Sequence, residues 1–489
     1  MSNQEPIRDA RTLGVPKMLI LGLQHMFAMF GATVLVPILV NNYGLPLSIQ
    51  TTLFFAGIGT LFFHVCTRLK VPAFLGSSFA FLGGFEAVSK LDSGKYAAME
   101  ASEKLQYACG GIVVAGLLYV ILAGIIKLVG VKKVMRYLPP VVTGPIIILI
   151  GLNLAPSAVS NASSCWWLAL VSIAIIVVAN VWGKGMIKII PILLGVVGSY
   201  VVALIANALG ATVTATQEVA MPIAEALASG ATITQIVDAA TVMVSQQVQV
   251  PLIDFSAVAA SSPIGLQPFF TGFGGSVAKF DLTSILVMAP IAIAAMMEHI
   301  GDMSAISATV GKNFIEDPGL HRTLIGDGLA TTLSAVFGGP ANTTYGENTG
   351  VLVLSRVHDP KVIRLAAIYA LILSFSPMFA AVVNSMPSAI VGGVSFILYG
   401  MISAIGVRNI VENKVDFTNS RNLIIAAVIL VCGLGFSSGL TFQVGGASVT
   451  LTGLAIAAIA GIVLNAILPG KDYEFGINQS GDENRGIHP

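Results

Sequence analysis

The sequence GGPANTTYGENTGVLVLSR, residues 338–356, lies among long apolar runs and decides how the rest of the chain is interpreted. Pro340 and the Thr343–Thr344 pair break the helical pattern, two glycines do the same, and Glu347 adds a carboxylate. Within a bilayer, irregular backbone is tolerated only where protein buries it or where it lines a wet cavity. An ionisable residue at such a place indicates a functional site. The alternative is a solvent-exposed loop between two helices.

The composition identifies the class of protein. Of the 489 residues, 55% are hydrophobic and only 10% are charged, and the mean hydropathy is +0.87. A soluble domain carries about 25% charged residues. We therefore predict an all-α polytopic membrane protein, with the lipid bilayer of the cell membrane as its surroundings. The net charge of +1 argues against a nucleic acid as a partner.

Runs of about 18–25 apolar residues predict transmembrane spans. Fourteen are expected, near residues 18–40, 48–67, 72–90, 106–129, 137–157, 165–183, 187–210, 282–304, 323–338, 341–356, 363–384, 388–406, 422–437 and 446–468. With this even number and the N-terminus inside, only Lys90, Lys95, Lys104 and Lys279 of the 25 Lys and Arg residues fall outside. This distribution follows the positive-inside rule, so both termini are predicted to be cytoplasmic. The polar tail over residues 471–489 is predicted to be disordered.

The longest connection, residues 211–281, is mildly acidic and rich in Ala, Thr, Val and Ser. It is predicted to lie outside the cell. We interpret residues 221–247 as one or two short amphipathic helices at the membrane surface.

The two halves of the chain resemble each other in three places, in the same order. Three pairs of segments correspond, namely Gln24-His25 with Glu298-His299, residues 77–81 with 343–347, and Pro140 and Gly144 with Pro387 and Gly392. A repeat of seven spans is odd, so the second copy enters the membrane from the opposite side. Inverted repeats place substrate near the midplane, at paired discontinuous helices. We therefore expect spans 3 and 10 each to hold a short extended piece followed by a half-helix, whose positive end faces a shared cavity.

Two carboxylates are expected on one face of the eighth span. Glu298 and Asp302 are four residues apart, a spacing that places both side chains on the same side of a helix. Two acids within a membrane helix are costly, which indicates a function. The alternative for Asp302 is a position at the cytoplasmic edge, past the end of the helix.

Glu347 is the third acid of the predicted site. A carboxylate accepts hydrogen bonds strongly from N–H groups, as a ring N–H of a neutral polar ligand would offer. Burial also disfavours the charged form of a carboxyl, which lets such a group take up and release a proton. The sequence does not decide which of Glu298, Asp302 and Glu347 binds ligand and which carries the proton.

Five further residues are secondary candidates. His25 and His299 are interpreted either as site residues or as hydrogen-bonded structural histidines. Asp327 is expected near the inner end of the ninth span, where it would orient a neighbouring residue. Phe79 and Tyr345 occupy equivalent places in the two repeats and are interpreted as stacking surfaces or as packing.

Several chemistries lack their motifs in this sequence. There is no G-x-x-x-x-G-K-[ST] motif for ATP, no Cys/His cluster for a metal and no nucleophile elbow for an enzyme. Secondary transport remains, without an organic cofactor and with protons as the coupling ion.

The chain also resembles the nucleobase–cation symporter-2 (nucleobase–ascorbate transporter) family, and within it the bacterial uracil permeases. The resemblance covers almost the whole chain. It is carried by QHMFAMFGATVLVP (residues 24–37), VPAFLGSSFAF (71–81), EDPGLHR (316–322), NTTYGEN (342–348) and ENTGVLVLSR (347–356).

The resemblance implies a fold, a substrate and its binding residues. The fold would comprise a core domain over residues 1–130 and 282–385 and a gate domain over 131–210 and 386–470, the core moving against the gate. The substrate would be uracil, bound by Glu298 and Glu347 and by backbone at Phe79 and Gly346. Three further residues would line the pocket: Ala32, Tyr345 and Tyr399. A homodimer through the gate domain is also implied.

Other functions stay open at this point. The resemblance places Asp302 at a position that is histidine in the best-known uracil permease, and aspartate there is similar to the purine-transporting branch. A purine transporter for xanthine or urate is therefore the first alternative. An anion exchanger or channel would favour a basic residue facing the half-helices, where this chain offers acids. A membrane-embedded enzyme is the remaining class.

Overall fold

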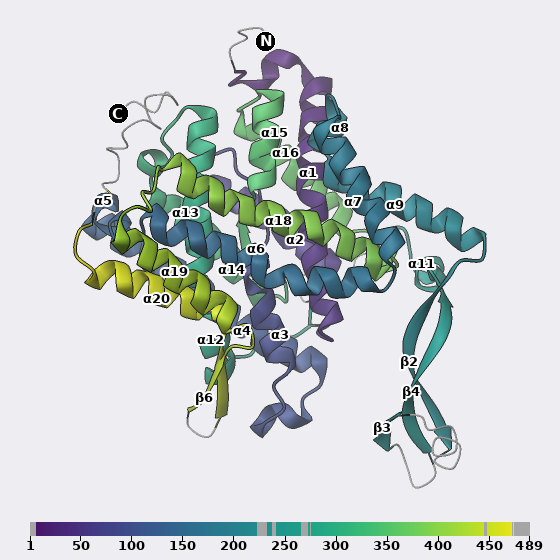
Figure 1. The fold of residues 1–489 in the computed structure, drawn as a ribbon. Helices are drawn as coiled ribbons and strands as arrows, with labels where there is room; N and C mark the ends of the chain where they lie inside the picture. Colours follow the sequence, from purple (N-terminus) through teal and green to yellow (C-terminus); the bar gives the residue numbers. More distant parts are fainter. Residues whose placement is uncertain are drawn as a thin grey trace.

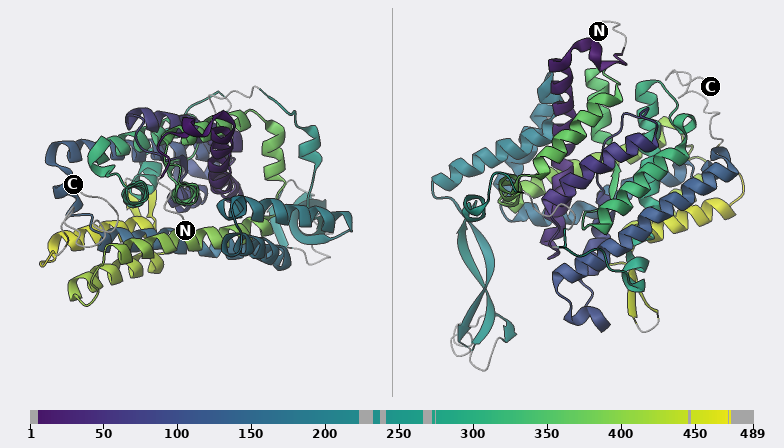
Figure 2. Two further views of the ribbon diagram at one scale, coloured as in Figure 1. Left: turned by 90° about the horizontal axis from the view of Figure 1, so that it is seen from above. Right: turned by 180° about the vertical axis from the view of Figure 1, so that it is seen from behind.

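The computed structural model describes residues 6–222, 232–236, 241–265, 272–273, 275–444, 447–471 and 473, and for residues 214–248, 347 and 443–449 it describes no side chains. Most of the tail that was predicted to be disordered lies outside these ranges. Helices form two layers when the molecule is seen from above (Figure 2).

The first layer contains helices from two parts of the chain, residues 15–129 and 282–384, that pack against one another. They are α1 (Val15–Asn42), α2 (Ile49–Cys66), α3 (Leu82–Ser89), α4 (Ala101–Val129), α12 (Leu282–Met288), α13 (Ile291–Val310), α14 (Leu320–Val336), α15 (Gly346–Ser355), α16 (Pro360–Ser374) and α17 (Pro377–Asn384). The second layer contains α6 (Pro140–Ser163), α7 (Trp166–Val181), α9 (Pro191–Ala208), α18 (Ser388–Glu412), α19 (Ser420–Gly435) and α20 (Gly453–Ile467). Short helices connect these elements, namely η1 (Ala10–Leu13), η2 (Phe79–Phe81), η3 (Gly94–Ala98), α5 (Val131–Met135), α8 (Met186–Ile189), α11 (Ser256–Ala260) and η4 (Ile315–Gly319).

Glycine pairs allow the closest helix contacts in each layer. In the first layer Gly116 of α4 faces Gly328 of α14, and a Cβ on either would lie 2.6 Å from the other's carbonyl oxygen. In the second layer Gly144 of α6 and Gly406 of α18 are similarly placed. Without a hydrophobic force between helices in lipid, such small residues supply the close packing that joins them.

The membrane character of the chain is evident from its helices. Within the part of the chain that the structure describes, seven helices are long and apolar enough to cross a bilayer, or eight if the bent pair α16–α17 is one span. Further apolar helices of 10–17 residues include α7, α19, α20 and the continuous helical segment Phe79–Ser89. Fourteen spans therefore remain a prediction, although a helical element lies at each expected position.

Two β-sheets project from the molecule, on the side opposite the N-terminal helix η1 (Figure 1). One is a three-stranded sheet in which β4 (Thr241–Pro251) lies between β2 (Thr212–Pro222) and β3 (Thr232–Ile236). The other pairs β6 (Leu440–Val444) with β7 (Ala447–Leu451).

The helices predicted over residues 221–247 were wrong where the structure describes this region. The sequences TVTATQEVAMP and TVMVSQQVQVP are rich in β-branched residues and alternate with a period of two, which favours strands. Residues 223–231 and 237–240 lie outside the described ranges.

Three other expectations need correction. The eleventh span is not continuous, because the chain bends by 88° between α16 and α17 where Pro377 starts a new helix. The segment expected as the fourteenth span begins with strand β7 before α20 starts. In the repeat, Pro387 precedes α18 as Pro139, not Pro140, precedes α6.

The N-terminal segment is strapped to the loop that follows α15. Ile7 N–H donates to Arg356 O at 2.9 Å, and Ala10 N–H donates to the buried carboxylate of Asp359 at 2.8 Å. Asp359 also accepts from Lys361 N–H at 3.0 Å and thereby caps α16. The Asp359 carboxylate therefore stabilises both the start of α16 and the position of the N-terminal segment.

Replacing Asp359 by alanine is expected to destabilise the protein by about 2 kcal/mol, because a helix cap is lost and the buried Ala10 N–H loses its acceptor. Asparagine should cost less, since its single oxygen can still cap α16. Thermal unfolding in detergent measures the effect. Asp416→Ala is the matched control, because Asp416 is exposed and its carboxylate accepts from Thr418 within its own turn. Equal melting of Asp359→Ala and the wild type would contradict the role given to this carboxylate.

Candidate functional site

Two short strands meet in the middle of the first layer. β1 (Leu75–Ser77) and β5 (Asn342–Thr344) pair antiparallel, and all of their residues are buried. The backbone N–H groups of Ser78 and Tyr345 continue the ladder with bonds of 2.8 and 3.0 Å to the opposite strand's flank. Extended backbone inside a membrane protein must find such partners. The pairing confirms the extended segments predicted for spans 3 and 10.

Threonines from neighbouring helices fix both strands in the same way. Leu75 N–H donates to Thr60 Oγ1 of α2 at 2.9 Å, and that hydroxyl donates to Leu75 O at 3.2 Å. Asn342 N–H donates to Thr331 Oγ1 of α14 at 3.1 Å, and that hydroxyl donates to Asn342 O at 2.9 Å. The same device in both halves is what a duplicated unit gives.

Helices begin directly after both strands and run in opposite directions (Figure 1). One is the segment Phe79–Ser89, formed by η2 and α3, and the other is α15, which starts at Gly346. The positive ends of both helix dipoles therefore lie where β1 and β5 pair, a place called the crossing of the strands below.

Helix α13 places two acids at the same crossing. Glu298 is half-buried and Asp302 is only 5% exposed. Both lie inside the helix, which continues to Val310, so the alternative position of Asp302 past a helix end is wrong. Thr344 Oγ1 donates to Asp302 Oδ2 at 2.9 Å and ties the acid to β5.

A chain of polar side chains leads from Asp302 into α14. Thr344 Oγ1 lies 3.5 Å from His299 Nδ1, and this nitrogen lies 2.9 Å from Asp327 Oδ2. His299 and Asp327 are completely buried. Asp327 stands in the middle of α14 rather than near its end, so its expected position was wrong. Among the described side chains, no three of His, Cys, Asp or Glu are grouped so that they could hold a metal ion.

A narrow cavity lies between the acids, the crossing strands and the second layer. Its lining consists of Phe79, Glu298, Asp302, Thr343, Thr344, Tyr345, Gly346, Ile147, Ile402 and Ile405. The isoleucines come from α6 and α18 of the second layer. The cavity volume is about 20 Å³, which is room for about one water molecule. A larger ligand requires the two layers to separate locally.

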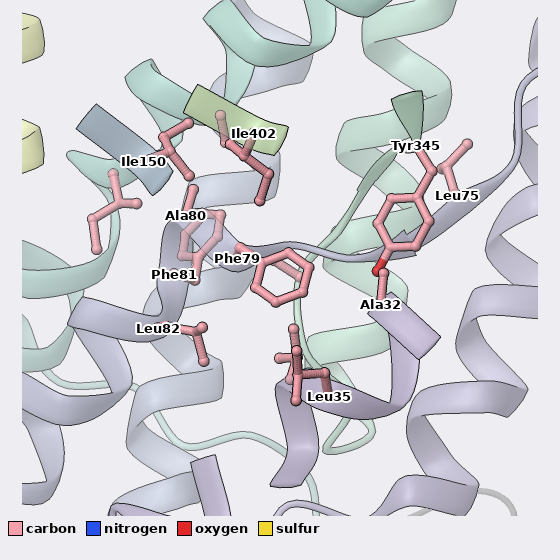
Figure 3. Close-up of a cluster of buried hydrophobic side chains, with 14 of the residues drawn as sticks. Ala32, Leu35, Leu75, Phe79, Ala80, Phe81, Leu82, Ile150, Tyr345 and Ile402 are labelled. Atoms are coloured by element: carbon pink, nitrogen blue, oxygen red, sulfur yellow. The ribbon is translucent and has the colours of Figure 1, made fainter. Parts of the chain in front are cut away.

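Two of the predicted aromatic residues, Phe79 and Tyr345, line this cavity, and Figure 3 shows both side chains. The ring of Phe79 meets that of Tyr399 edge-on, with centroids 5.9 Å apart and planes at 76°. Tyr345 OH donates to Ser77 O at 2.8 Å, and Figure 3 shows Ala32 beside its hydroxyl end. Ala32 and Tyr399 thus lie next to lining residues and are not themselves among those that line the cavity.

Two other candidates have different positions. Glu347 belongs to the first turn of α15 by its backbone, and its side chain lies outside the described ones. His25 is buried on α1 away from the cavity lining. Asn348 Nδ2 donates to His25 O at 3.1 Å and lies 3.3 Å from His25 Nδ1, so this histidine joins α1 to α15.

A larger cavity of about 710 Å³ reaches the other side of Phe79. Its wall includes Glu86 of α3 and Lys90 just after that helix, Asn153 of α6, and Thr441 and Thr450 of the β6–β7 hairpin. Phe79 therefore stands between this cavity and the narrow one, because it lines both.

Sequence reasoning missed two kinds of site residue. Thr344 was noted as a helix breaker, but its bond to Asp302 joins residues 42 positions apart and leaves no local pattern. The isoleucines of the second layer lie in ordinary apolar runs that give no signal. The one indication in the sequence was that Thr344 is polar and belongs to a segment predicted to be extended.

Residues 16–442 of the chain match the protein family described as "Permease family". The chain is 39% identical over 474 residues to a uracil permease of Bacillus caldolyticus, which covers 95% of this chain and 94% of that relative. It is 38% identical over 465 residues to a uracil permease of Bacillus subtilis, with 92% of each chain covered.

Among solved structures, the transmembrane domain of the cyanobacterium bicarbonate transporter BicA is similar to this chain, with a TM-score of 0.56 and 13% sequence identity. The similarity covers 94% of this chain and 99% of that domain. At this identity it concerns the fold alone. The two layers described above therefore share the fold of that domain.

Proposed function

Because this chain belongs to the permease family, and within it to the nucleobase–cation symporter-2 proteins, we propose that it imports uracil together with protons. It is an integral membrane transporter of nucleobases and not an enzyme, as its similarity to permeases over nearly the whole chain shows. Uracil as the substrate rests on the names of those relatives. That protons are the coupling ion is our inference from the buried acids described above.

The observation that carries the proposal is the convergence of two acids and two helix starts on one cavity. Uracil offers two ring N–H donors and two carbonyl acceptors on a flat ring. The carboxylates of Glu298 and Glu347 suit the N–H donors. Backbone N–H groups at Phe79 and Gly346, at the positive helix ends, suit the carbonyl oxygens. The ring of Phe79 offers a stacking surface.

The polar chain from Asp302 through Thr344 and His299 to Asp327 supports proton coupling. An acid that exchanges its proton within such a chain alters the bonds that hold β5 and α13 together. We propose that Asp302 is the group whose protonation is coupled to uracil binding, with Glu298 and Glu347 in contact with the ligand.

Alternating access would arise from movement between the layers. We assign residues 1–130 and 282–385 to the core and residues 131–210 and 386–470 to the gate. The gate isoleucines Ile147, Ile402 and Ile405 close the cavity from one side. The larger cavity on the hairpin side of Phe79 would be the route from outside, with both termini in the cytoplasm. A homodimer through the gate is part of the same proposal.

Uptake of labelled uracil into proteoliposomes tests the proposal, with and without an inward proton gradient. We expect the gradient to stimulate uptake, and excess unlabelled uracil, but not xanthine, to block it. Uptake by Asp302→Asn should show a ratio with and without the gradient close to one, because the variant cannot release the proton. Asp416→Asn is the control and should respond to the gradient as the wild type does, since Asp416 is an exposed loop residue.

Two results would contradict the proposal. Transport of xanthine in place of uracil would favour the purine alternative. Full gradient stimulation of Asp302→Asn would remove Asp302 from proton coupling while leaving the substrate unaffected.

A further inference from the structure

A second pocket lies outside the transport site, where the chain passes from the first layer to the second. It has a volume of about 510 Å³. Residues at the end of α4, along α5 and before α6 line it, namely Leu122, Ile125, Val129, Lys133, Val134, Arg136, Tyr137 and Leu138. One part of this lining is aliphatic and the other carries two cations and a tyrosine.

The charges around the pocket have one sign. Lys127, Lys132, Lys133 and Arg136 are all exposed, and no Asp or Glu occurs in the sequence from residue 104 to residue 217. None of these four cations makes an ion pair with a carboxylate of the described residues. An uncompensated cluster of this kind attracts an anion.

The cationic part of the pocket is held in place by α20. The buried Asn465 donates to Arg136 O and to Tyr137 O, both at 3.1 Å. Arg421 of α19 donates to Asn465 Oδ1 at 2.6 Å and fixes its orientation. Lys471 adds another cation, with its Nζ 5.0 Å from the centre of the Tyr137 ring.

The aliphatic part faces outward along α4. Ile125 and Val129 are 44% and 47% exposed, and the adjacent Leu128 is 87% exposed. In a membrane-spanning protein such side chains contact lipid. The pocket therefore joins a hydrocarbon surface to a cluster of cations, with Tyr137 between them at the position typical of a membrane interface.

We propose that this pocket binds one anionic phospholipid. The phosphate of the headgroup would lie between Lys133 and Arg136. The part of the acyl chain nearest the headgroup would lie against Leu122, Ile125 and Val129. Basic pockets between membrane helices bind anionic headgroups in this manner. A free phosphate would use only the cations and leave the aliphatic half without a function, which favours the lipid.

Native mass spectrometry and thermal unfolding of the detergent-solubilised full chain test this site, with added phosphatidylglycerol or phosphatidylcholine. We expect the wild type to retain one phosphatidylglycerol and to melt at a higher temperature with it. Lys133→Gln/Arg136→Gln should weaken this binding about tenfold or more, since each cation near an anionic lipid contributes separately. Lys184→Gln/Lys188→Gln is the matched control, because it removes two charges from an acid-free segment elsewhere and should bind like the wild type.

A second variant tests the aliphatic half. Leu122→Trp fills that part of the pocket, leaves every charge in place, and should also lose the retained lipid. The proposal is overturned if phosphatidylcholine binds as well as phosphatidylglycerol. It is also overturned if inorganic phosphate alone gives the same shift in melting temperature, or if the matched control loses as much binding as Lys133→Gln/Arg136→Gln.

Discussion

Replacing Glu298 by glutamine is expected to weaken uracil binding about 100-fold and to abolish measurable uptake. Glutamine has nearly the same shape, but it removes the negative charge and presents an amide N–H₂ where a ring N–H of the ligand needs an acceptor. Loss of a charge-assisted hydrogen bond, together with an unpaired donor inside a closed site, costs about 3 kcal/mol. Titration calorimetry in detergent measures the Kd directly and does not depend on a proton gradient.

Glu412→Gln provides the control for this variant. Glu412 is at the end of α18, where it pairs with Arg408 at 2.7 Å on the protein surface. Its substitution should leave uracil affinity within twofold of the wild type. If Glu298→Gln bound uracil with unchanged affinity while remaining folded, Glu298 would not contact the ligand.

Replacing Gly76 by alanine is expected to cost about 3 kcal/mol of stability, at the upper end for overpacking, and to eliminate uptake. A Cβ at this position would overlap the ring of Tyr345 and lie 2.7 Å from Thr33 Oγ1. Neither neighbour can move freely. The Tyr345 hydroxyl donates to Ser77 O, and Ser77 Oγ donates to Thr33 O at 2.8 Å. The overlap would therefore distort the crossing strands on which the cavity is built.

Gly350→Ala is the matched control in the same part of the fold. A Cβ at Gly350 would meet nothing within 4 Å, and alanine favours the helical conformation of α15. Its melting temperature should equal or exceed that of the wild type. Gly76→Ala protein that melts like the wild type and transports uracil would show that the crossing tolerates more volume than its geometry indicates.

The central features of the fold could be predicted because polar or irregular residues are rare inside membrane spans and are easily recognised in the sequence. Residues 342–347 stood out as polar and irregular inside an apolar chain, and the structure has strand β5 and the start of α15 there. The spacing of Glu298 and Asp302 likewise placed both acids at one cavity. In each case polar or charged residues inside a membrane helix or span are energetically unfavourable, so their presence in the sequence indicated a function.

Other features depend on contacts between distant residues and could not be predicted. His299 and Asp327 meet because α13 and α14 pack together, and each residue alone looks like an ordinary polar interruption. The bend after α16 and strand β7 both fell within predicted spans, since hydropathy reports burial in lipid and not backbone direction. The sheet of β2, β3 and β4 was missed because residues 221–247 were interpreted as short amphipathic helices.

The pairing of β1 with β5 has a consequence for biosynthesis. Tyr345, whose hydroxyl bonds to Ser77 O, is made 268 residues later than Ser77. At roughly 5–20 residues per second, the first strand waits on the order of 10–50 s in the membrane before its partner emerges from the ribosome. During that interval Thr60 can satisfy one pair of its backbone groups. The cavity beside these strands is therefore completed late in synthesis, and part of the β1 backbone has no strand partner until residue 342 has been inserted.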